Sequence, residues 1–143
     1  MLMGDYTKPL PKIDELTRPY WEYARRHELS VQRCRACGHH QFPPAPVCQQ
    51  CLGDDLGWQV VSGRGRLVTW TWFHRAYWSS FVEELPYNVA VIRLEEGPQI
   101  ISNLVGALAE EGAAQRQGLP VRAVFDDVTP EISLVRFAQD GDA

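Results

Sequence analysis

The sequence predicts a mainly β protein, in which an N-terminal helix and a short cysteine-rich ribbon precede a five-stranded β-barrel. Three observations indicate this class. All four cysteines fall within residues 34–51, as two Cys-x2-Cys pairs. From Gly57 onward, apolar and polar residues alternate with the two-residue period of β-strands. The chain has 143 residues, of which 45% are hydrophobic, which is enough for one core.

Residues 1–33 are predicted to form an extended arm followed by a helix. Two prolines limit helix formation in the first 18 residues. Pro19 suits the first turn of a helix, where its missing N–H is not needed. We expect the helix to run to about Glu28 and to bury one face, after which residues 29–33 alternate like a strand. The predicted buried face carries Tyr20, Trp21, Ala24 and His27.

Residues 34–57 are predicted to form a rubredoxin-like zinc ribbon. Ten residues separate two Cys-x2-Cys pairs, so each pair can form a tight turn with both thiolates facing one point. Four thiolates complete a tetrahedral zinc site. Gly38 and Gly53 follow the two pairs and suit the turns. Such a closed shell makes the metal structural, and it stabilises a segment too short for its own core. The predicted ligands are Cys34, Cys37, Cys48 and Cys51.

Other chemistries for the four cysteines are less well supported. Two disulfides would need an oxidising compartment, and a redox Cys-x-x-Cys is usually a single pair at a helix start. An iron–sulfur cluster usually has different ligand spacing. Iron in the same four-thiolate geometry stays open. His39 and His40 are ligand types, but four cysteines already fill the shell, so we expect both histidines at the surface or in contact with the ligands from outside.

Residues 58–138 are predicted to form the barrel, and residues 139–143 a frayed tail. Residues 58–74 suggest a strand, a glycine turn at Gly63 and Gly65, and a longer strand. In that longer strand, alternation is expected to place two sets of side chains on opposite faces. The two sets are Val68, Trp70 and Trp72 against Leu67, Thr69, Thr71 and Phe73.

The rest of the barrel follows the same alternation. Two strands surround a turn at Gly97 and Pro98, a short helix is predicted at 107–117, and two further strands follow at 119–128 and 131–138. About five strands, with a helical segment between the third and fourth, is the layout of an OB-fold. Other small barrels share this pattern.

The composition of the chain argues against some classes of function. The net charge of −4 argues against a nucleic-acid binder, which usually has a basic surface. Apolar runs are too short for a transmembrane helix, and the N-terminus lacks the apolar core of a signal peptide. We therefore expect a cytoplasmic protein.

The sequence does not describe an autonomous enzyme. With the cysteines committed to metal, no thiol remains as a nucleophile. Gly63-x-Gly65 lacks the third glycine of a dinucleotide-binding loop. The carboxylate pairs at 83–84, 95–96 and 126–127 are adjacent on strands or loops, and we expect them to be solvated. His74 is the best-placed acid–base residue, although a structural or binding role fits it better.

Several stretches together closely resemble the domain of unknown function 35 family. They are "TRPYWEYARRHEL", "CRACG", "FPP", "GWQVVSGRGRL", "TWFH", "VAVIRLEEGPQIISNLVG" and "VRAVFDD". The resemblance runs from about Thr17 to Phe137, and the four ligand positions match. It implies a helix, a zinc ribbon and an OB-fold. It also implies a small partner of thiolase-like enzymes, including retro-aldolases that shorten steroid side-chain CoA esters, with some members joined to enoyl-CoA hydratases.

The hypothesis that follows is a non-catalytic, zinc-containing subunit of an acyl-CoA-processing complex, acting on fatty acyl or steroid side-chain CoA esters. The catalytic partner would be a thiolase or a lipid-transfer-protein-like aldolase, with acyl-CoA at the shared site. The loop from Arg75 to Tyr87 offers aromatic side chains for this contact, because aromatic residues are enriched at interface centres. The predicted contact residues are His74, Tyr77, Trp78 and Phe81.

Two other hypotheses remain from the sequence. A single-stranded nucleic-acid module would use Trp70 and Trp72 as a stacking platform. An enzyme acting alone on CoA esters would show turnover by the isolated chain.

Overall fold

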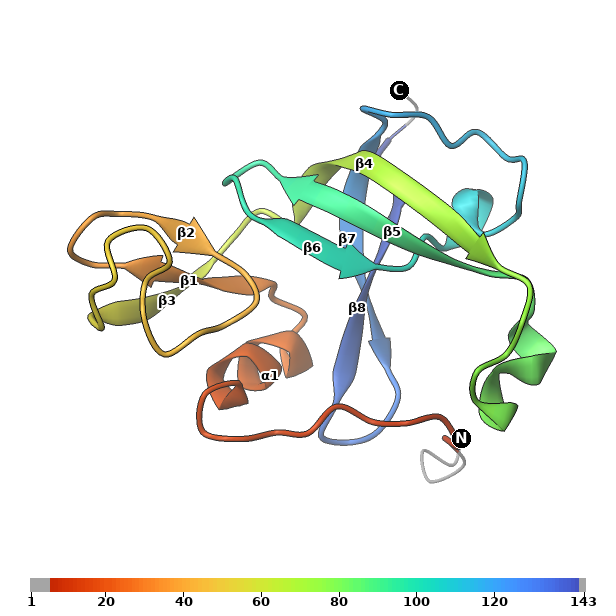
Figure 1. Ribbon diagram of the computed structural model, residues 1–143. Helices are drawn as coiled ribbons and strands as arrows, with labels where there is room; N and C mark the ends of the chain where they lie inside the picture. The colour runs from red at the N-terminus through yellow and green to blue at the C-terminus, as the bar shows by residue number, and fades with distance from the viewer. Residues whose placement is uncertain (1–5, 142–143) are drawn as a thin grey trace.

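The computed structural model describes residues 6–141, which form two antiparallel sheets with a helix between them (Figure 1). The smaller sheet has the order β2-β1-β3, and the larger has the order β6-β5-β4-β7-β8. The predicted class, mainly β with one helix, a ribbon and a five-stranded barrel, is confirmed. Within residues 6–141, no helix is long and apolar enough to span a bilayer.

The N-terminal helix α1 spans Arg18–Arg25, with Pro19 in its first turn. It ends earlier than predicted because His27 adopts a left-handed backbone with φ 60°. Tyr20 and Ala24 are buried on the expected face, and Trp21 packs against the core. The placement of His27 on that face is wrong. From its exposed ring, Nε2 donates a 2.9 Å hydrogen bond to Asp127 Oδ1 of β7.

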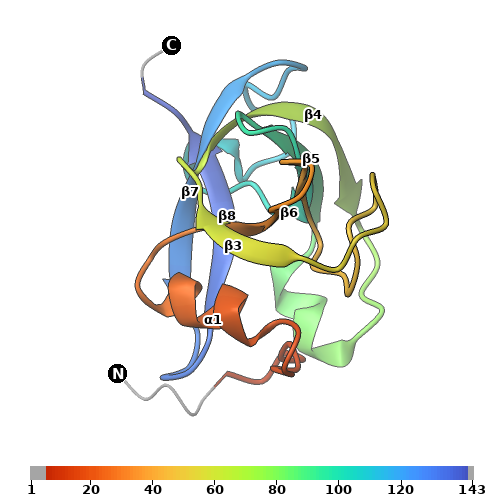
Figure 2. The ribbon, with the colours of Figure 1, turned by 90° about the vertical axis from the view of Figure 1, so that its left-hand side faces the viewer.

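The ribbon sheet consists of β1 (Ser30–Cys34), β2 (His40–Gln41) and β3 (Leu56–Val60). The central strand β1 pairs with β3 from Ser30 opposite Val60 to Cys34 opposite Leu56. The strand β3 therefore lies on both sides of the predicted boundary between ribbon and barrel at 57/58. Figure 2 shows α1 beneath β3, which faces the viewer.

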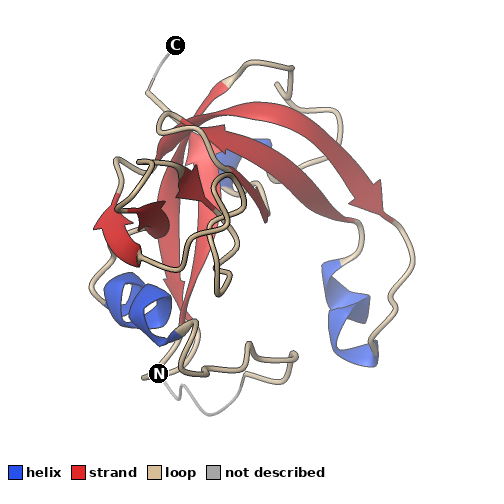
Figure 3. Ribbon diagram, turned by 60° about the vertical axis from the view of Figure 1, so that its left-hand side comes forward, coloured by secondary structure: helices blue, strands red, loops and turns tan. Residues whose placement is uncertain are grey.

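The barrel sheet contains β4 (Arg64–Phe73), β5 (Tyr87–Leu94), β6 (Gln99–Ser102), β7 (Pro120–Asp127) and β8 (Ser133–Gln139). The sheet is strongly curled (Figure 3), and the segment just after β6 lies against β8. There, a parallel bridge joins Leu104 to Phe137, and the N–H of Val105 donates to the Phe137 carbonyl at 2.9 Å. This closure completes the OB-fold layout.

The prediction of a helix at residues 107–117 is wrong. A single 3-10 turn, η3 (Gly106–Leu108), stands there and is followed by turns. Gly112 has φ 85°, a left-handed conformation that an α-helix does not contain. A second 3-10 helix, η2 (Ser79–Glu84), lies in the loop between β4 and β5.

The face assignment for β4 is also wrong, because the strand contains a β-bulge. The register with β5 shifts just after Leu67, which leaves Val68 as the extra residue. Leu67 lies opposite buried Ile92, and Trp70 lies opposite buried Ala90. Leu67 and Trp70 thus face the same, inner side of the sheet, since paired residues share a face.

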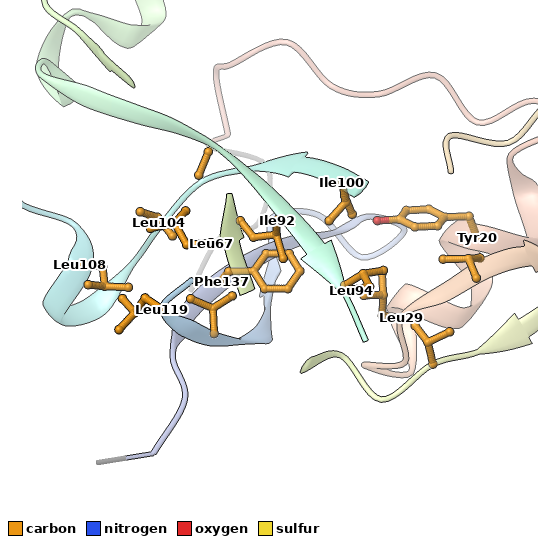
Figure 4. Packing of buried hydrophobic residues seen from close by; sticks show 14 residues of the cluster. Tyr20, Leu29, Leu67, Ile92, Leu94, Ile100, Leu104, Leu108, Leu119 and Phe137 are labelled. Atoms are coloured by element: carbon orange, nitrogen blue, oxygen red, sulfur yellow. The ribbon is translucent and has the colours of Figure 1, made fainter. Parts of the chain in front are cut away.

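One core joins the ribbon to the barrel. Phe137, Leu67 and Ile92 are at most 1% exposed and fill the barrel. Figure 4 shows Tyr20 of the helix and Leu29, which lies just before β1, beside Leu94 and Ile100 of the barrel. The helix thus fills the space between the two sheets and buries apolar surface from both.

The link between the two sheets is held by the turn that follows β5. The N–H of Ser62 donates to Glu96 Oε2 at 3.0 Å, and Ser62 Oγ donates to Glu95 Oε2 at 3.2 Å. The N–H of Arg64 donates to Ser62 Oγ at 3.1 Å. Glu95 is exposed, as expected, whereas Glu96 is half-buried, and both carboxylates hold Ser62 just after the end of the ribbon.

The carboxylates of the other two pairs are exposed, as expected, and at least one member of each pair also forms a surface ion pair. The ion-pair partners are Lys8 for Glu84, Arg136 for Asp126 and His27 for Asp127. The hydroxyl of Ser133 also donates to Asp127, and this hydrogen bond, followed by the one from His27, lowers the pKa of the carboxyl. Adjacent carboxylates therefore serve separate contacts.

Candidate metal centre and interaction surface

The four cysteines converge on one point of the ribbon. Cys34 ends β1, Cys37 lies in the following turn, and the second pair lies in the loop between β2 and β3. The Sγ atoms of Cys34 and Cys51 are 3.6 Å apart, as are those of Cys37 and Cys48. All four Sγ atoms lie within 4.8 Å of one another. The predicted ligand set is thus brought together.

Each cysteine pair forms a turn in which backbone amides point at sulfur. The N–H of Cys37 donates to Cys34 Sγ at 3.5 Å, and the N–H of Cys51 donates to Cys48 Sγ at 3.5 Å. In the first turn, Gly38 has φ 81°, as expected. In the second, the left-handed residue is Leu52, with φ 64°, and not Gly53.

In each pair, these hydrogen bonds favour the thiolate form of the first cysteine, which is the form that a metal requires. The N–H of Cys51, followed by that of Gln50, lowers the pKa of Cys48 to about 7. The N–H of Cys37 lowers the pKa of Cys34. Cys34 and Cys48 are fully buried, while Cys37 and Cys51 are exposed.

The geometry fits zinc. Zn–S bonds of about 2.3 Å in a tetrahedron place the sulfurs about 3.8 Å apart. The 3.6 Å separations match this spacing, and four thiolates fill the shell. The site is therefore suited to a structural zinc ion, with no position left for water or substrate. His39 and His40 stand outside the group of ligands, and the ring of His40 contacts Gln59 Oε1 at 3.3 Å.

Two buried glutamines support the loop that carries the second cysteine pair. Gln32 of β1 and Gln41 of β2 are each 3% exposed, and Gln41 Nε2 donates to Gln32 Oε1 at 2.9 Å. Gln41 also donates to the Val47 carbonyl and accepts from the N–H of Gln49, next to Cys48. Sequence reasoning missed both glutamines. The sequence did contain a signal for them, because each is a glutamine at a strand position next to an apolar residue.

Replacing Gln41 by leucine is expected to destabilise the ribbon by about 2 kcal/mol, because the Gln49 N–H and the Val47 carbonyl lose their partner. The zinc-loaded variant should unfold at a lower temperature and lose zinc to a chelator at a lower chelator concentration. Gln50→Leu is the matched control, since Gln50 is exposed. Equal melting temperatures and zinc affinities for both variants would show that the network is unimportant.

The loop between β4 and β5 is anchored to the barrel by a row of aromatic rings. The centroids of Phe73 and Tyr87 are stacked at 5.1 Å. Tyr77 packs on Phe73 at 6.0 Å, and Phe81 packs on Tyr87 at 5.4 Å. Phe81 thus faces the barrel rather than solvent.

The other side of the same loop is open to solvent. Tyr77 is 68% exposed, Trp78 is 62% exposed and Val82 is 57% exposed. His74 lies nearby in sequence but makes a separate contact, an ion pair of 2.9 Å with Glu111. The predicted contact residues therefore divide into an exposed pair, Tyr77 and Trp78, a lining residue, Phe81, and a histidine bound elsewhere.

The two tryptophans offered for nucleic-acid stacking do not form an exposed platform. Trp70 packs against the core, and both residues are only partly accessible. They are paired with the inward-facing residues Ala90 and Asn88. The arrangement removes the feature on which the nucleic-acid hypothesis depended.

Two family models cover most of the chain. The model described as the ChsH2 rubredoxin-like zinc ribbon domain matches residues 21–57. The model described as the ChsH2 C-terminal OB-fold domain matches residues 58–126. The architecture and the zinc site agree with both descriptions.

Individual relatives extend the match. A "probable enoyl-CoA hydratase alpha subunit" of Thermomonospora curvata is 31% identical over 91% of this chain, which spans only 39% of that protein. A "benzoylsuccinyl-CoA thiolase subunit BbsA" of Thauera aromatica is 30% identical over 73% of this chain and 72% of its own length.

A solved structure titled "Ltp2-ChsH2(DUF35) aldolase" contains a chain that is 31% identical, with a TM-score of 0.79 over 91% of this chain and 98% of that one. A "DUF35 domain-containing scaffold protein" of Pyrococcus furiosus is 33% identical over 73% of this chain and 74% of its own length. The chain therefore belongs to the DUF35 family of zinc-ribbon and OB-fold proteins.

Proposed function

We propose that this chain is a non-catalytic subunit of a complex that processes acyl-CoA, and that a thiolase or a lipid-transfer-protein-like aldolase is its catalytic partner. The observation that carries the proposal is the likeness to the chain of the Ltp2-ChsH2(DUF35) aldolase, because it extends over 98% of that chain. The match to a thiolase subunit of similar length supports the same class of partner.

The site chemistry supports a helper rather than a catalyst. The thiolates are arranged to hold a metal in a closed shell, so they are not available as nucleophiles. His74 is exposed and is paired with an exposed carboxylate, that of Glu111, and it does not line a pocket among the described residues. The bond-breaking step, such as the retro-aldol cleavage of a β-hydroxyacyl-CoA, is assigned to the partner.

We place the partner contact on the exposed side of the loop between β4 and β5. Tyr77 and Trp78 extend from a loop that aromatic packing anchors to the barrel. Large rings held in place lose little conformational freedom on binding and are common at interface centres. His74 lies beside them in the same loop and is included at the edge of this surface.

Replacing Trp78 by alanine is expected to weaken binding of the partner about 30-fold, which corresponds to about 2 kcal/mol for a central ring. Because Trp78 is exposed, the melting temperature should stay unchanged. The measurement is recovery of the partner with the tagged chain from its native host, followed by identification by mass spectrometry and titration of the purified pair.

The matched control is Val47→Ala, which truncates an exposed apolar residue on the ribbon loop. Equal partner recovery with Trp78→Ala and with wild type would exclude this loop from the interface. Recovery of no thiolase-like or aldolase protein by the wild-type chain would overturn the proposed function itself.

The proposed cellular compartment rests on the chemistry of the four cysteines. We place the protein in the cytoplasm, because a reducing compartment keeps clustered thiols available for metal.

A further inference from the structure

Four arginine side chains gather on the outer face of the barrel sheet. Arg66 of β4 lies directly opposite Arg93 of β5. Arg64, two residues earlier in β4, lies directly opposite Arg122 of β7. Leu94, next to Arg93, is buried, so the alternation of the strands turns the arginines to the outer side of the sheet. All four are exposed, and we call this group the arginine face.

Like charges directly opposite each other in a sheet are unfavourable, and the arginine face contains two such pairs. Side chains in these positions have Cβ atoms about 5 Å apart, so their guanidinium groups repel each other. Arg66 Nη1 donates to the Gly118 carbonyl at 3.1 Å, which is a hydrogen bond to a neutral group and removes no charge. The isolated chain therefore carries an electrostatic cost at this face.

Nearby carboxylates offset little of this charge. Among residues 6–141, Glu95 is the one carboxylate that forms an ion pair with the face, and its Oε1 lies 3.7 Å from Arg64 Nε. Asp140 lines a hollow beside β7 together with Arg122, but no ion pair joins them. The face thus concentrates positive charge in a chain whose net charge is −4.

An apolar patch adjoins the arginines on the same face. Ile101 of β6 is 72% exposed and lies opposite Val91 of β5. Val91 is two residues from Arg93 in one strand, so both side chains point to the same side of the sheet. Interface centres are enriched in apolar area and in arginine, and depleted of lysine. The outer face of the barrel therefore has the composition of a protein interface.

The arginine face and the aromatic loop lie at opposite ends of β4 and β5. Phe73, the last residue of β4, is seven residues beyond Arg66, which corresponds to about 23 Å along an extended strand. In Figure 1, β4 ends at the loop that carries η2, whereas β5 ends on the side of the ribbon. A protein bound at the arginine face therefore leaves Tyr77 and Trp78 accessible.

We infer that the arginine face is a second docking surface, and that it binds an acidic segment of a partner protein, with an apolar side chain between its carboxylates. Guanidinium groups donate paired hydrogen bonds to carboxylates, and the apolar side chain packs on Ile101. A partner carboxylate placed between two opposed arginines replaces their repulsion by two attractive contacts. The inference goes beyond the proposed function and does not depend on it.

A nucleic acid fits this face less well than an acidic protein segment. Proteins that bind single strands combine cations with aromatic rings on which the bases stack. The residues that pair with the arginines from the neighbouring strands carry no aromatic ring, and they are Gln99, Pro120 and Ala138. An oligonucleotide is therefore the probe that separates the two kinds of partner.

The test is a fluorescence-anisotropy titration of the full zinc-loaded chain with the labelled peptide Glu-Glu-Leu-Glu-Glu-Leu-Glu-Glu. This peptide should bind about 30-fold more tightly than the same peptide with glutamine in place of every glutamate, because charged hydrogen bonds are the stronger ones. Raising NaCl from about 0.05 M to about 0.5 M should weaken its binding about 10-fold, since salt screens exposed charges. Equal affinity for the two peptides, or no binding of the acidic one, would overturn the inference.

Two further probes test whether the face selects a protein segment. Oligothymidine of the same charge should bind more weakly than the acidic peptide, and tighter binding would overturn the inference in favour of a nucleic acid. Inorganic phosphate should displace the peptide no better than NaCl of equal ionic strength. Complete displacement by phosphate alone would show a general anion site and would also overturn the inference.

Charge reversal at Arg93 separates a docking role from a structural one. Arg93→Glu places a carboxylate opposite Arg66, so it should raise the melting temperature by about 2 °C while weakening the acidic peptide about 10-fold. Arg18→Glu makes the same change in net charge at an exposed position of α1 and should leave the peptide affinity unchanged. Equal peptide affinities for the two variants, or a lower melting temperature for Arg93→Glu, would contradict the inference.

Ile101→Gln tests the apolar part of the face. It should weaken the acidic peptide about 5-fold, because it removes an apolar contact and keeps every charge. The melting temperature should not change, since Ile101 is 72% exposed. Leu10→Gln, at an exposed apolar position of the N-terminal arm, is the matched control. Wild-type affinity in Ile101→Gln would place the peptide elsewhere and overturn the inference.

The two docking surfaces can be tested separately. Trp78→Ala should bind the acidic peptide as the wild-type chain does, because Trp78 lies beyond the other end of β4. Loss of peptide binding in this variant would place the peptide on the aromatic loop and overturn the assignment of the arginine face. That result leaves the proposed function untouched, because recovery of the catalytic partner decides it.

Discussion

Replacing Cys48 by serine is expected to remove zinc from the chain and unfold the ribbon. A serine hydroxyl does not replace a thiolate in a four-sulfur zinc shell, and Cys48 is fully buried. Zinc binding stabilises comparable small modules by about 10 kcal/mol, which is as much as the total stability of many domains. The ribbon sheet, with a β2 of two residues, cannot replace that contribution.

The loss should extend into the barrel. Leu29 at the start of the ribbon packs in the same core as Leu94 and Ile100, so an unfolded ribbon exposes barrel residues to water. We expect less than 0.1 zinc per chain by elemental analysis, red-shifted fluorescence from Trp58 in β3, and a lower melting temperature. Treating the wild-type chain with a chelator should give the same result.

Gln50→Ser is the matched control for this substitution. Gln50 is exposed, and its backbone N–H, which donates to Cys48 Sγ at 3.4 Å, is kept. The control should hold one metal ion per chain, and elemental analysis would identify that ion as zinc or iron. A Cys48→Ser chain that keeps one metal ion and the wild-type melting temperature would exclude the four-cysteine site.

The second large effect is expected from Gly65→Ala. Gly65 was expected to belong to the turn, but it lies in β4, opposite Leu94 and Val121. A Cβ atom there would stand 2.5 Å from the Arg93 carbonyl oxygen and 2.8 Å from Ile92 Cγ2. Backbone must move to relieve such a contact, so we expect a loss of about 3 kcal/mol in the free energy of unfolding.

Gly57→Ala is the comparison that separates crowding from a general effect of alanine. Gly57 is also a buried strand glycine, but its added Cβ would meet the guanidinium of Arg35, at 2.8 Å. Arg35 is 62% exposed and can turn toward solvent, giving up an exposed ion pair with Asp55. In urea denaturation, the midpoint of the Gly65→Ala variant should be well below that of the Gly57→Ala variant. Equal midpoints would mean that β4 and β5 are not as close as described.

Local patterns predicted the parts of this protein that depend on neighbours in sequence. Two Cys-x2-Cys pairs and Gly38 predicted the metal ligands, because a tight turn brings residues three apart together. Alternation predicted β5 and β6 with their turn for the same reason. The end of the helix before His27 and the left-handed Leu52 were not predicted, because positive φ is uncommon for residues other than glycine.

The features that were missed depend on contacts between distant segments. Val68 becomes a bulge only against β5, and that one extra residue reversed the faces assigned to half of β4. Glu95 and Glu96 meet Ser62 across 33 and 34 residues. Gln32 and Gln41 hold a loop whose path the sequence did not show.

The strand shared across the boundary has a consequence for gene fusion. In the hydratase relative, a segment like this one accounts for 39% of a longer protein. A recombination point at residue 57 or 58 would cut β3, leaving two of its residues attached to β1 and sending the other three away with the barrel. Ser62 lies just past the last residue that pairs with β1. It is therefore the earliest position after the ribbon at which a ribbon from another gene could be joined without splitting β3.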